Sequence, residues 1–308
     1  MPILPEDREK YKQFIINRLI DLDSVTYPPE TTVWHYTTGA GLLGIIESGA
    51  IYATHVACLN DSTEIRYAVK LYYDALESVR QKSAGDPEAI KFLTRVLEIN
   101  LDDPKLPRHG SSPYFVACFS NLEDDLPQWR AYSESGGENG YAIGFHARAL
   151  YDPIGGLLRV NYDTEKHKAM AARTAEAALQ FFRDGLRDKR ATTVEQWEEE
   201  FIREWSEVTS RLAPVVKDAC FETENEFRLV HGLDASELPR IKFRQKDTLL
   251  SRHLPLSFQD FPRLPIAKVT IGPGRQQHVS RISVHALLTQ KGYRNVPVEI
   301  SQRPLQRT

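Results

Sequence analysis

Two almost uninterrupted apolar runs constrain the fold of this chain most strongly. They lie at residues 114–120 and 140–145, and segments rich in glycine or proline precede both of them. Apolar runs of this length are typical of strands that are buried on both faces. Further strands and amphipathic helices flank them without the regular alternation of strand and helix that a parallel sheet requires. The pattern predicts an α+β fold in a single domain, residues 1–308.

The spacing of apolar residues predicts the other elements along the chain. Strands are expected at residues 34–38, 51–56, 157–162, 226–230, 241–244, 249–256, 267–271 and 296–300. Helices are expected at residues 7–22, 41–48, 65–79, 87–100, 163–184, 193–216 and 277–290. Glycine at position 49 is expected to end the second of these helices. Residues 163–216 form a predicted helical insert ahead of the strand at 226–230.

The composition is that of an ordinary globular protein and favours no charged partner. The 308 residues carry a formal net charge of −3, with 41% hydrophobic and 26% charged residues. A balance of this kind gives no global electrostatic attraction for nucleic acid or for an anionic membrane. The three cysteines, Cys58, Cys118 and Cys220, are isolated, without metal-ligand spacing. We therefore expect reduced thiols, no metal, no membrane partner and a cytoplasmic location.

A histidine-bearing strand near the start of the fold is the first candidate for a functional site. Trp34, His35, Tyr36 and Thr37 precede a compact helix and a second strand. Histidine and threonine are costly to bury without hydrogen-bond partners, so such a run gains little as plain core. The segment therefore indicates a site, provided that other residues lie opposite it.

A second candidate is the acidic strand near residue 226. In an extended chain, Phe227 and Leu229 would face the core, and Glu224, Glu226 and Arg228 would share the other face. Two carboxylates and a guanidinium could bind ribose hydroxyls and stabilise positive charge. The same pattern also fits a solvated strand face whose ion pair contributes little to stability.

The third candidate follows the apolar run that ends at Ser120. Trp129, Arg130 and Tyr132 lie in a predicted loop or short helix shortly after it. Aromatic rings can stack on nicotinamide or adenine, and arginine pairs with phosphates. Alternatively, Trp129 and Tyr132 simply cover the edge of the sheet.

In their order along the chain, these motifs resemble a bacterial family known only as a domain of unknown function, DUF2971. The motifs that carry the resemblance are His-Tyr-Thr, Gly-Leu-x-x-Ile-x-x-Gly, Leu-Asn-Asp-x-x-Glu, Cys-Phe-Ser, Gln-Trp-x-x-Tyr, a glycine-bearing strand and Glu-x-Glu-aromatic-Arg. They occupy residues 35–37, 41–49, 59–64, 118–120, 128–132, 140–145 and 224–228. The similarity spans residues 30–300, and the family itself implies no defined activity.

A further likeness, to the ADP-ribosyltransferase superfamily, implies an NAD site. The resemblance implies a mixed, mostly antiparallel split sheet surrounded by helices. In that superfamily a first-strand histidine contacts the nicotinamide-side ribose, and this role would fall to His35. Tyr36 and Thr37 would flank it, and Thr37 or Ser120 would support the bound NAD.

The same likeness implies the catalytic carboxylates. Glu226 would grip the ribose 2′-hydroxyl and stabilise the oxocarbenium-like transition state in which nicotinamide departs. Glu224 would stand where arginine-directed members carry a second acid that orients the acceptor.

The likeness also implies roles for the aromatic and basic side chains. Trp129 or Tyr132 would stack on the nicotinamide ring. Arg130 and Arg228 would meet the pyrophosphate.

The function that this resemblance implies is ADP-ribosyl transfer or NAD glycohydrolysis. NAD would be the nucleotide substrate, no metal would be required, and the acceptor would be an unidentified protein or nucleic acid. A toxin-like or phage-defence effector would fit such an activity. Two alternatives remain open: a catalytically silent nucleotide-binding, sensor or antitoxin-type domain, and an enzyme acting on RNA 2′-phosphates.

Overall fold

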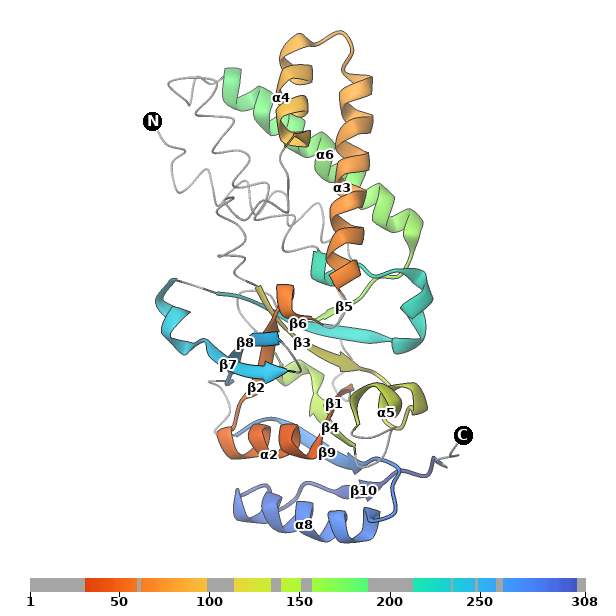
Figure 1. The fold of residues 1–308 in the computed structure, drawn as a ribbon, viewed down its shortest axis with the longest axis vertical. Helices are drawn as coiled ribbons and strands as arrows, with labels where there is room; N and C mark the ends of the chain where they lie inside the picture. Colours follow the sequence, from red (N-terminus) through yellow and green to blue (C-terminus); the bar gives the residue numbers. More distant parts are fainter. Residues whose placement is uncertain are drawn as a thin grey trace. The chain divides into compact units, whose positions relative to one another are not determined.

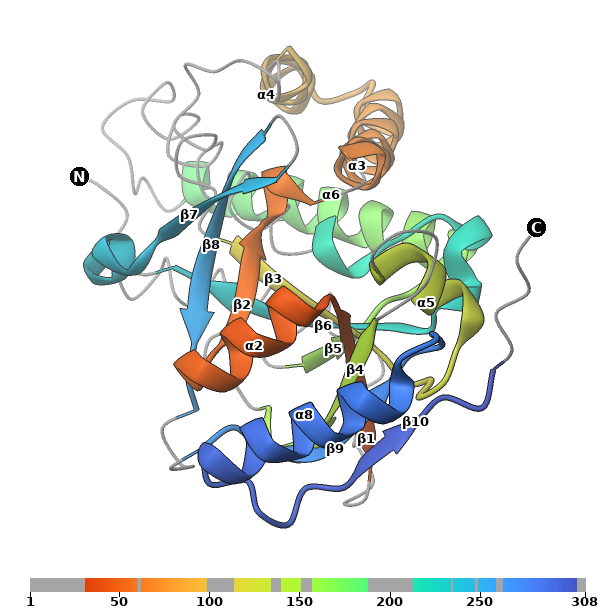
Figure 2. The same cartoon turned by 60° about the horizontal axis from the view of Figure 1, so that its bottom comes forward.

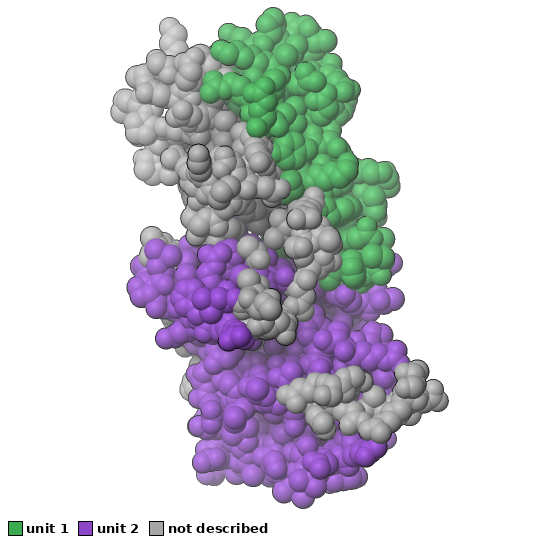
Figure 3. Space-filling view, in the orientation of Figure 1, with its two compact units in different colours: residues 1–25, 60–112, 161–221 green, residues 26–59, 113–160, 222–308 purple. Residues whose placement is uncertain are grey.

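The structure of the chain is a computed structural model. It describes residues 31–59, 62–98, 114–133, 140–150, 157–187, 213–233, 235–246, 249–258 and 263–303. The chain forms two compact units, each built from separate stretches of sequence (Figure 3). Unit 1 comprises residues 1–25, 60–112 and 161–221, and unit 2 comprises residues 26–59, 113–160 and 222–308. The single-domain interpretation is not tested by this division and stays a prediction.

The described part of unit 1 is helical. Its elements are α3 (Ser62–Lys82), α4 (Pro87–Leu97), α6 (Thr164–Arg187) and the short 3₁₀ helix η4 (Ala213–Val215). Phe92 of α4 and Phe182 of α6 stack with ring centroids 3.7 Å apart. Asp86 caps α4 by accepting a hydrogen bond from the backbone N–H of Ala89, and its carboxylate also pairs with Arg183 at 2.7 Å. The cap and the ion pair therefore attach the start of α4 to α6.

Unit 2 is built on a mixed, mostly antiparallel open sheet (Figures 1 and 2). The strand order along the main path is β10-β9-β4-β1-β3-β2-β8-β7, and β6 pairs with both β3 and β5. Of the strand pairs in the described chain, β9 with β10 is parallel and the rest are antiparallel. The strands are β1 (Thr32–Thr37), β2 (Ile51–His55), β3 (Tyr114–Ser120), β4 (Tyr141–His146), β5 (Leu157–Arg159), β6 (Glu226–Gly232), β7 (Lys242–Lys246), β8 (Leu249–Leu256), β9 (Ile266–Ile271) and β10 (Val298–Ile300).

Strand β3 has three neighbours, because two strands share one of its edges. β6 pairs with β3 over its whole length, from Tyr114 to Ser120. On the other edge, β2 pairs with β3 at Phe115 and Val116, whereas β1 pairs with it at Ser120. The edges of β1 and β2 therefore separate along the middle of β3, and a gap in the ladder opens near Cys118.

Alternating side chains produce a separate core on each face of the sheet. Val33 and Phe119 belong to the large core, which α2 (Gly39–Ser48) and α8 (Gln277–Gln290) cover with apolar side chains. Trp34 and Tyr36 belong to a smaller core on the other face, where α5 (Leu126–Tyr132) contributes Trp129. The residues just before and after His35 thus point into the small core.

Most elements expected from the sequence are confirmed, with shifts of a few residues at their ends. The α+β class is confirmed, and α8 has the expected bounds. The expected helix at 7–22 and nearly all of that at 193–216 lie outside the described residues.

The structure also bears on the expectations about disulfides and membrane-spanning helices. In the described chain, Cys58, Cys118 and Cys220 form no disulfide. Among the described helices, none combines the length and the apolar composition that crossing a bilayer would demand.

The glycine that ends α2 gives a test of the local folding argument. Gly49 has φ 64°, and a Cβ added there would meet no atom within 4 Å. We expect Gly49→Ala to lower the free energy of unfolding by about 1 kcal/mol, through backbone strain alone. Gly85 has equally open space without a positive φ, so Gly85→Ala should change stability little. Urea unfolding followed by tryptophan fluorescence measures both, and equal effects would contradict the argument.

Candidate functional site

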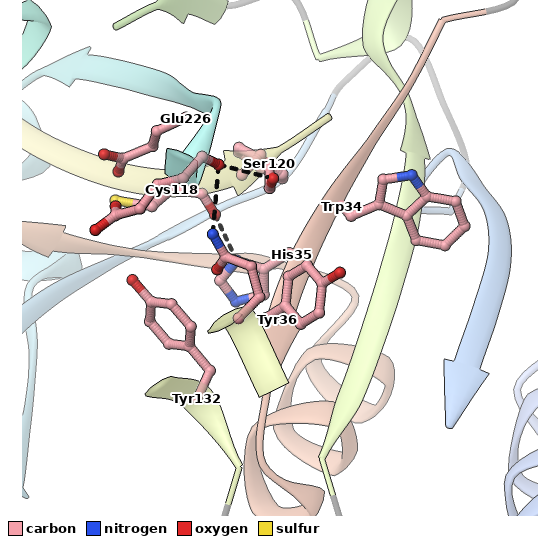
Figure 4. A pocket seen from close by; sticks show the side chains of 10 residues that line it. Trp34, His35, Tyr36, Cys118, Ser120, Tyr132 and Glu226 are labelled. Carbon is pink, nitrogen blue, oxygen red and sulfur yellow. Dashed lines mark hydrogen bonds between the residues drawn. The ribbon is translucent and has the colours of Figure 1, made fainter. Parts of the chain in front are cut away.

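The gap beside β3 opens into a small pocket in unit 2, with about 40 Å³ of space that water could occupy (Figure 4). It lies where β1 and β3 separate beyond the pair formed by Trp34 and Ser120. Strands β1, β3 and β6, helix α5 and the turn before β6 contribute its walls. The lining residues are Trp34, His35, Tyr36, Cys118, Phe119, Ser120, Gln128, Tyr132, Glu224 and Glu226.

His35 bridges the gap between the two strands. Its Nδ1 lies 2.9 Å from the carbonyl oxygen of Cys118, and because a carbonyl can only accept, Nδ1 must carry the proton. This hydrogen bond satisfies a backbone group that no strand covers at this point. The other ring nitrogen, Nε2, makes no hydrogen bond with any described residue and can act as an acceptor in the neutral ring.

Burial lowers the pKa of His35, and the nearby positive charge of Arg244 lowers it further, against the opposing hydrogen bond to Cys118. The imidazole is therefore neutral at pH 7. A neutral ring on the pocket wall accepts a hydrogen bond from a hydroxyl group, and it adds no charge of its own.

Ser120 ties the end of β3 to the turn that leads into β6. Its hydroxyl donates to the carbonyl oxygen of Glu224 at 2.9 Å and accepts from the backbone N–H of Leu122 at 3.2 Å. Gln128 lies 3.4 Å from the same Glu224 oxygen. Ser120 thus positions the wall of the pocket through these bonds.

Glu224 does not lie on the strand with Glu226, so the predicted extended segment 224–228 is wrong at its start. Glu224 ends the 3₁₀ helix η5 (Ala219–Glu224), and Asn225 follows with φ 45°. Asparagine tolerates this left-handed conformation better than most residues, and here it redirects the chain into β6. Glu224 nevertheless lines the pocket beside Glu226.

Glu226 and Arg228 form a buried ion pair, so the alternative of a solvated strand face is also wrong. Their side chains are 7% and 3% exposed. Arg228 donates from Nε and Nη2 to the two carboxylate oxygens at 2.9 and 2.8 Å. A bidentate pair of this kind fixes the carboxylate in one orientation. As predicted, both residues lie on the face opposite Phe227 and Leu229, opposite Ser120 and Cys118 of β3.

The aromatic residues of the site divide into a buried pair and one pocket residue. Trp129 is 1% exposed and meets Tyr36 edge-on, with centroids 4.7 Å apart. The hydroxyl of Tyr36 donates to the carbonyl oxygen of Leu122 at 2.7 Å and accepts from the N–H of Asp125. Tyr132 instead lines the pocket, and its hydroxyl points to the side on which Glu226 lies (Figure 4). Of the two rings predicted to stack on a ligand, Tyr132 is the one on the pocket surface.

Asp124, just ahead of α5, joins this wall to the end of the described chain. Its Oδ1 accepts hydrogen bonds from the indole N–H of Trp129 at 2.8 Å and from the hydroxyl of Ser301 at 2.6 Å. Its Oδ2 accepts from the backbone N–H of Gln302, and its carbonyl accepts from Arg303. The position of the buried indole therefore depends on the segment after β10.

Four predicted site residues are not among the lining residues: Trp129, described above, and Thr37, Arg130 and Arg228. Thr37 pairs with Tyr141 of β4, and Arg130 is exposed on α5. Arg228, the other predicted pyrophosphate contact, already donates two hydrogen bonds to Glu226.

Three lining residues, Cys118, Phe119 and Gln128, were missed by the sequence interpretation, and so was Arg244. Cys118 shares a strand face with Ser120, so alternation along β3 could have placed it. Gln128 precedes Trp129 and belongs to the Gln-Trp-x-x-Tyr motif. Arg244 lies on β7, and no sequence signal connects it with His35, because the two strands are far apart in the sequence. Among the described residues, no cluster of histidine, cysteine or carboxylate side chains could hold a metal.

Comparison with known proteins identifies a family and no activity. Residues 128–229 match the model of a family described as "Protein of unknown function (DUF2971)". This match confirms the family resemblance over the residues that it covers, which hold the motifs at 128–132 and 224–228 and include Tyr132 and Glu226 of the pocket. The motifs at 35–37, 41–49, 59–64 and 118–120 lie outside the match. No curated protein and no solved structure matches the chain.

The neutral His35 predicts a pH dependence of stability. Because its pKa in the folded protein is below the ordinary value of 6.5, the unfolded chain binds the proton more readily. The contribution of His35 to the free energy of unfolding is fully present above about pH 6.5. It is lost as the pH falls from there through the pKa that His35 has in the folded protein. We expect His35→Gln to reduce the loss of stability measured by urea unfolding between pH 7.5 and 5.5. His285 is exposed on α8, so His285→Gln should leave that loss unchanged. A wild-type pH dependence in His35→Gln would contradict the prediction.

Proposed function

We propose that the pocket binds NAD and breaks the bond between nicotinamide and ribose, with transfer of ADP-ribose to an acceptor or to water. The observation that carries the proposal is the convergence of His35, Ser120 and Glu226, from three different strands, on one pocket. The separation of β1 and β2 along β3 also agrees with the split sheet of the ADP-ribosyltransferase superfamily.

The proposed reaction requires stabilisation of positive charge on a sugar. The bond from ribose C1′ to the nicotinamide nitrogen breaks, and nicotinamide leaves as a neutral molecule with the bonding electron pair. The ribosyl group that remains has oxocarbenium character until an acceptor oxygen or nitrogen bonds to C1′ and loses its proton. A fixed carboxylate in a pocket with little water stabilises that charge most effectively. Glu226, oriented by Arg228, supplies such a carboxylate.

The other pocket residues have matching roles in this proposal. His35 Nε2 accepts a hydrogen bond from a ribose hydroxyl, since Nδ1 is committed to Cys118. Tyr132 offers a ring face to nicotinamide, and Glu224 lies beside Glu226 to orient an acceptor. Ser120 acts indirectly, because its hydroxyl already bonds the backbone at Glu224 and Leu122.

Release of nicotinamide from NAD tests the proposal directly. The purified full-length protein is assayed with and without cell lysate as a source of acceptor. Glu226→Gln should lower the rate by about 10²–10³-fold, the usual effect of removing a main electrostatic stabiliser. Glu222 is exposed and close in sequence, so Glu222→Gln is the matched control and should retain the wild-type rate. Equal turnover by wild type and Glu226→Gln would refute the role of Glu226.

The stability of the variants must be measured alongside the rates. Glu226→Gln leaves the buried Arg228 guanidinium without this carboxylate, which should cost about 3–5 kcal/mol in the free energy of unfolding. The double variant Glu226→Gln/Arg228→Gln removes both charges and should be more stable than the single variant. It should still lack turnover, which separates loss of catalysis from loss of fold.

A catalytically silent nucleotide-binding domain is the second candidate, and one observation favours it. Both oxygens of Glu226 already accept hydrogen bonds from Arg228, so a ribose hydroxyl would have to share them. Saturable NAD binding by calorimetry, with no nicotinamide released, would support this candidate over the enzyme. Activity on RNA 2′-phosphates stays a prediction from the sequence, since no described contact favours it.

A further inference from the structure

Strand β8 buries two polar side chains, each with one hydrogen-bonding atom that has no partner in the described chain. Ser251 is 0% exposed and His253 is 8% exposed. Neither Ser251 Oγ nor His253 Nδ1 has a hydrogen-bond partner in the described chain. Being two residues apart on one strand, they share a face of the sheet. A buried polar atom without a partner costs free energy, so two of them side by side indicate a ligand-binding position.

Two cations lie directly across from these residues on the edge strand β7. Arg244 pairs with Ser251 and Lys242 pairs with His253 in the antiparallel register. Residues opposite one another in such a pair share a face, with Cβ atoms about 4.5–5.5 Å apart. Both cationic side chains are exposed, and no carboxylate of the described chain forms an ion pair with either one.

We propose that Lys242, Arg244, Ser251 and His253 form a binding subsite for a phosphate group. Each of the four can donate a hydrogen bond, and the two cations supply the charge that a phosphate needs. Arginine in particular presents a planar pair of N–H groups that matches two phosphate oxygens. The four residues thus offer donors and positive charge with no acidic side chain among them.

The subsite lies close to the candidate pocket. Arg244 is near enough to His35 to lower the pKa of that ring, and Arg244 and Lys242 both lower the pKa of His253, after burial as the main cause. The positive charge of Arg244 therefore influences both His35 in the pocket and His253 in the subsite. A nucleotide whose ribose lies at His35 would place its phosphates on β7 and β8, whereas Arg228 is bonded to Glu226 and Arg130 is exposed on α5.

The identity of the ligand as a nucleotide rests on the proposed function, whereas phosphate binding by itself does not. The two parts are therefore tested separately. Inorganic pyrophosphate, ADP and adenosine serve as probes for the full-length protein in isothermal titration calorimetry at low salt. Binding of pyrophosphate measures the affinity of the subsite alone, and binding of adenosine measures the affinity of the pocket for a nucleoside without phosphates.

We expect wild type to bind pyrophosphate and to bind ADP more tightly than adenosine. Arg244→Gln should weaken the binding of pyrophosphate and ADP by on the order of tenfold or more, the usual contribution of a charge-assisted contact. It should leave the binding of adenosine unchanged. Ser251→Ala should also weaken the binding of pyrophosphate. Arg281 is exposed on α8, so Arg281→Gln removes the same charge elsewhere and should bind as wild type does.

Two results would overturn the subsite: no pyrophosphate binding by the folded wild type, or equal weakening by Arg244→Gln and Arg281→Gln. If pyrophosphate binding depends on Arg244 while NAD is neither bound nor cleaved, the subsite stands and the proposed function fails. If NAD is cleaved equally well by wild type and Arg244→Gln, and pyrophosphate does not bind, the proposed function stands and the subsite fails.

Discussion

The hydrogen bond from His35 Nδ1 to the carbonyl oxygen of Cys118 supports the arrangement around the pocket. A sheet normally pairs each backbone group with a neighbouring strand, and separating two strands exposes groups that must find another partner. Where β1 separates from β3, the side chain of His35 supplies the hydrogen bond that a neighbouring strand would otherwise provide. The pocket can therefore exist inside the sheet without an unsatisfied carbonyl at Cys118.

This arrangement also decides which groups a ligand would meet. The capped carbonyl is occupied, and the hydroxyl groups of Ser120 and Tyr36 are bonded to the backbone. The second nitrogen of His35 makes no hydrogen bond with a described residue, and the ring of Tyr132 and the Arg228-bound carboxylate of Glu226 line the pocket with it. The proposed NAD binding rests on these three groups, a nitrogen acceptor, an aromatic face and a fixed anion. The same groups would serve recognition equally well if Arg228 keeps the carboxylate occupied.

Much of the sheet could be predicted from the sequence, because its strands are bounded by clear turn residues and its helices have a regular apolar period. The site was predictable only in part. Alternation correctly placed Glu226 and Arg228 on one face, but local periodicity cannot show that Asn225 adopts a left-handed conformation and removes Glu224 from the strand. Nor could it show that the Trp129 indole is buried, since a tryptophan in a short helix fits a core and a binding surface equally well. The proximity of Arg244 to His35 arises from strands far apart in the sequence.

The attachment of Asp124 to Ser301 and Gln302 has a consequence for the order of events during synthesis. The strands that carry the pocket residues are complete once the ribosome has passed β6, yet the wall containing Trp129 still lacks one of its anchors. That anchor arrives only with the residues that follow β10. A nascent chain therefore holds the chemical groups of the pocket long before it can fix their geometry, so any activity of this site would begin only after the segment around Ser301 has emerged and docked.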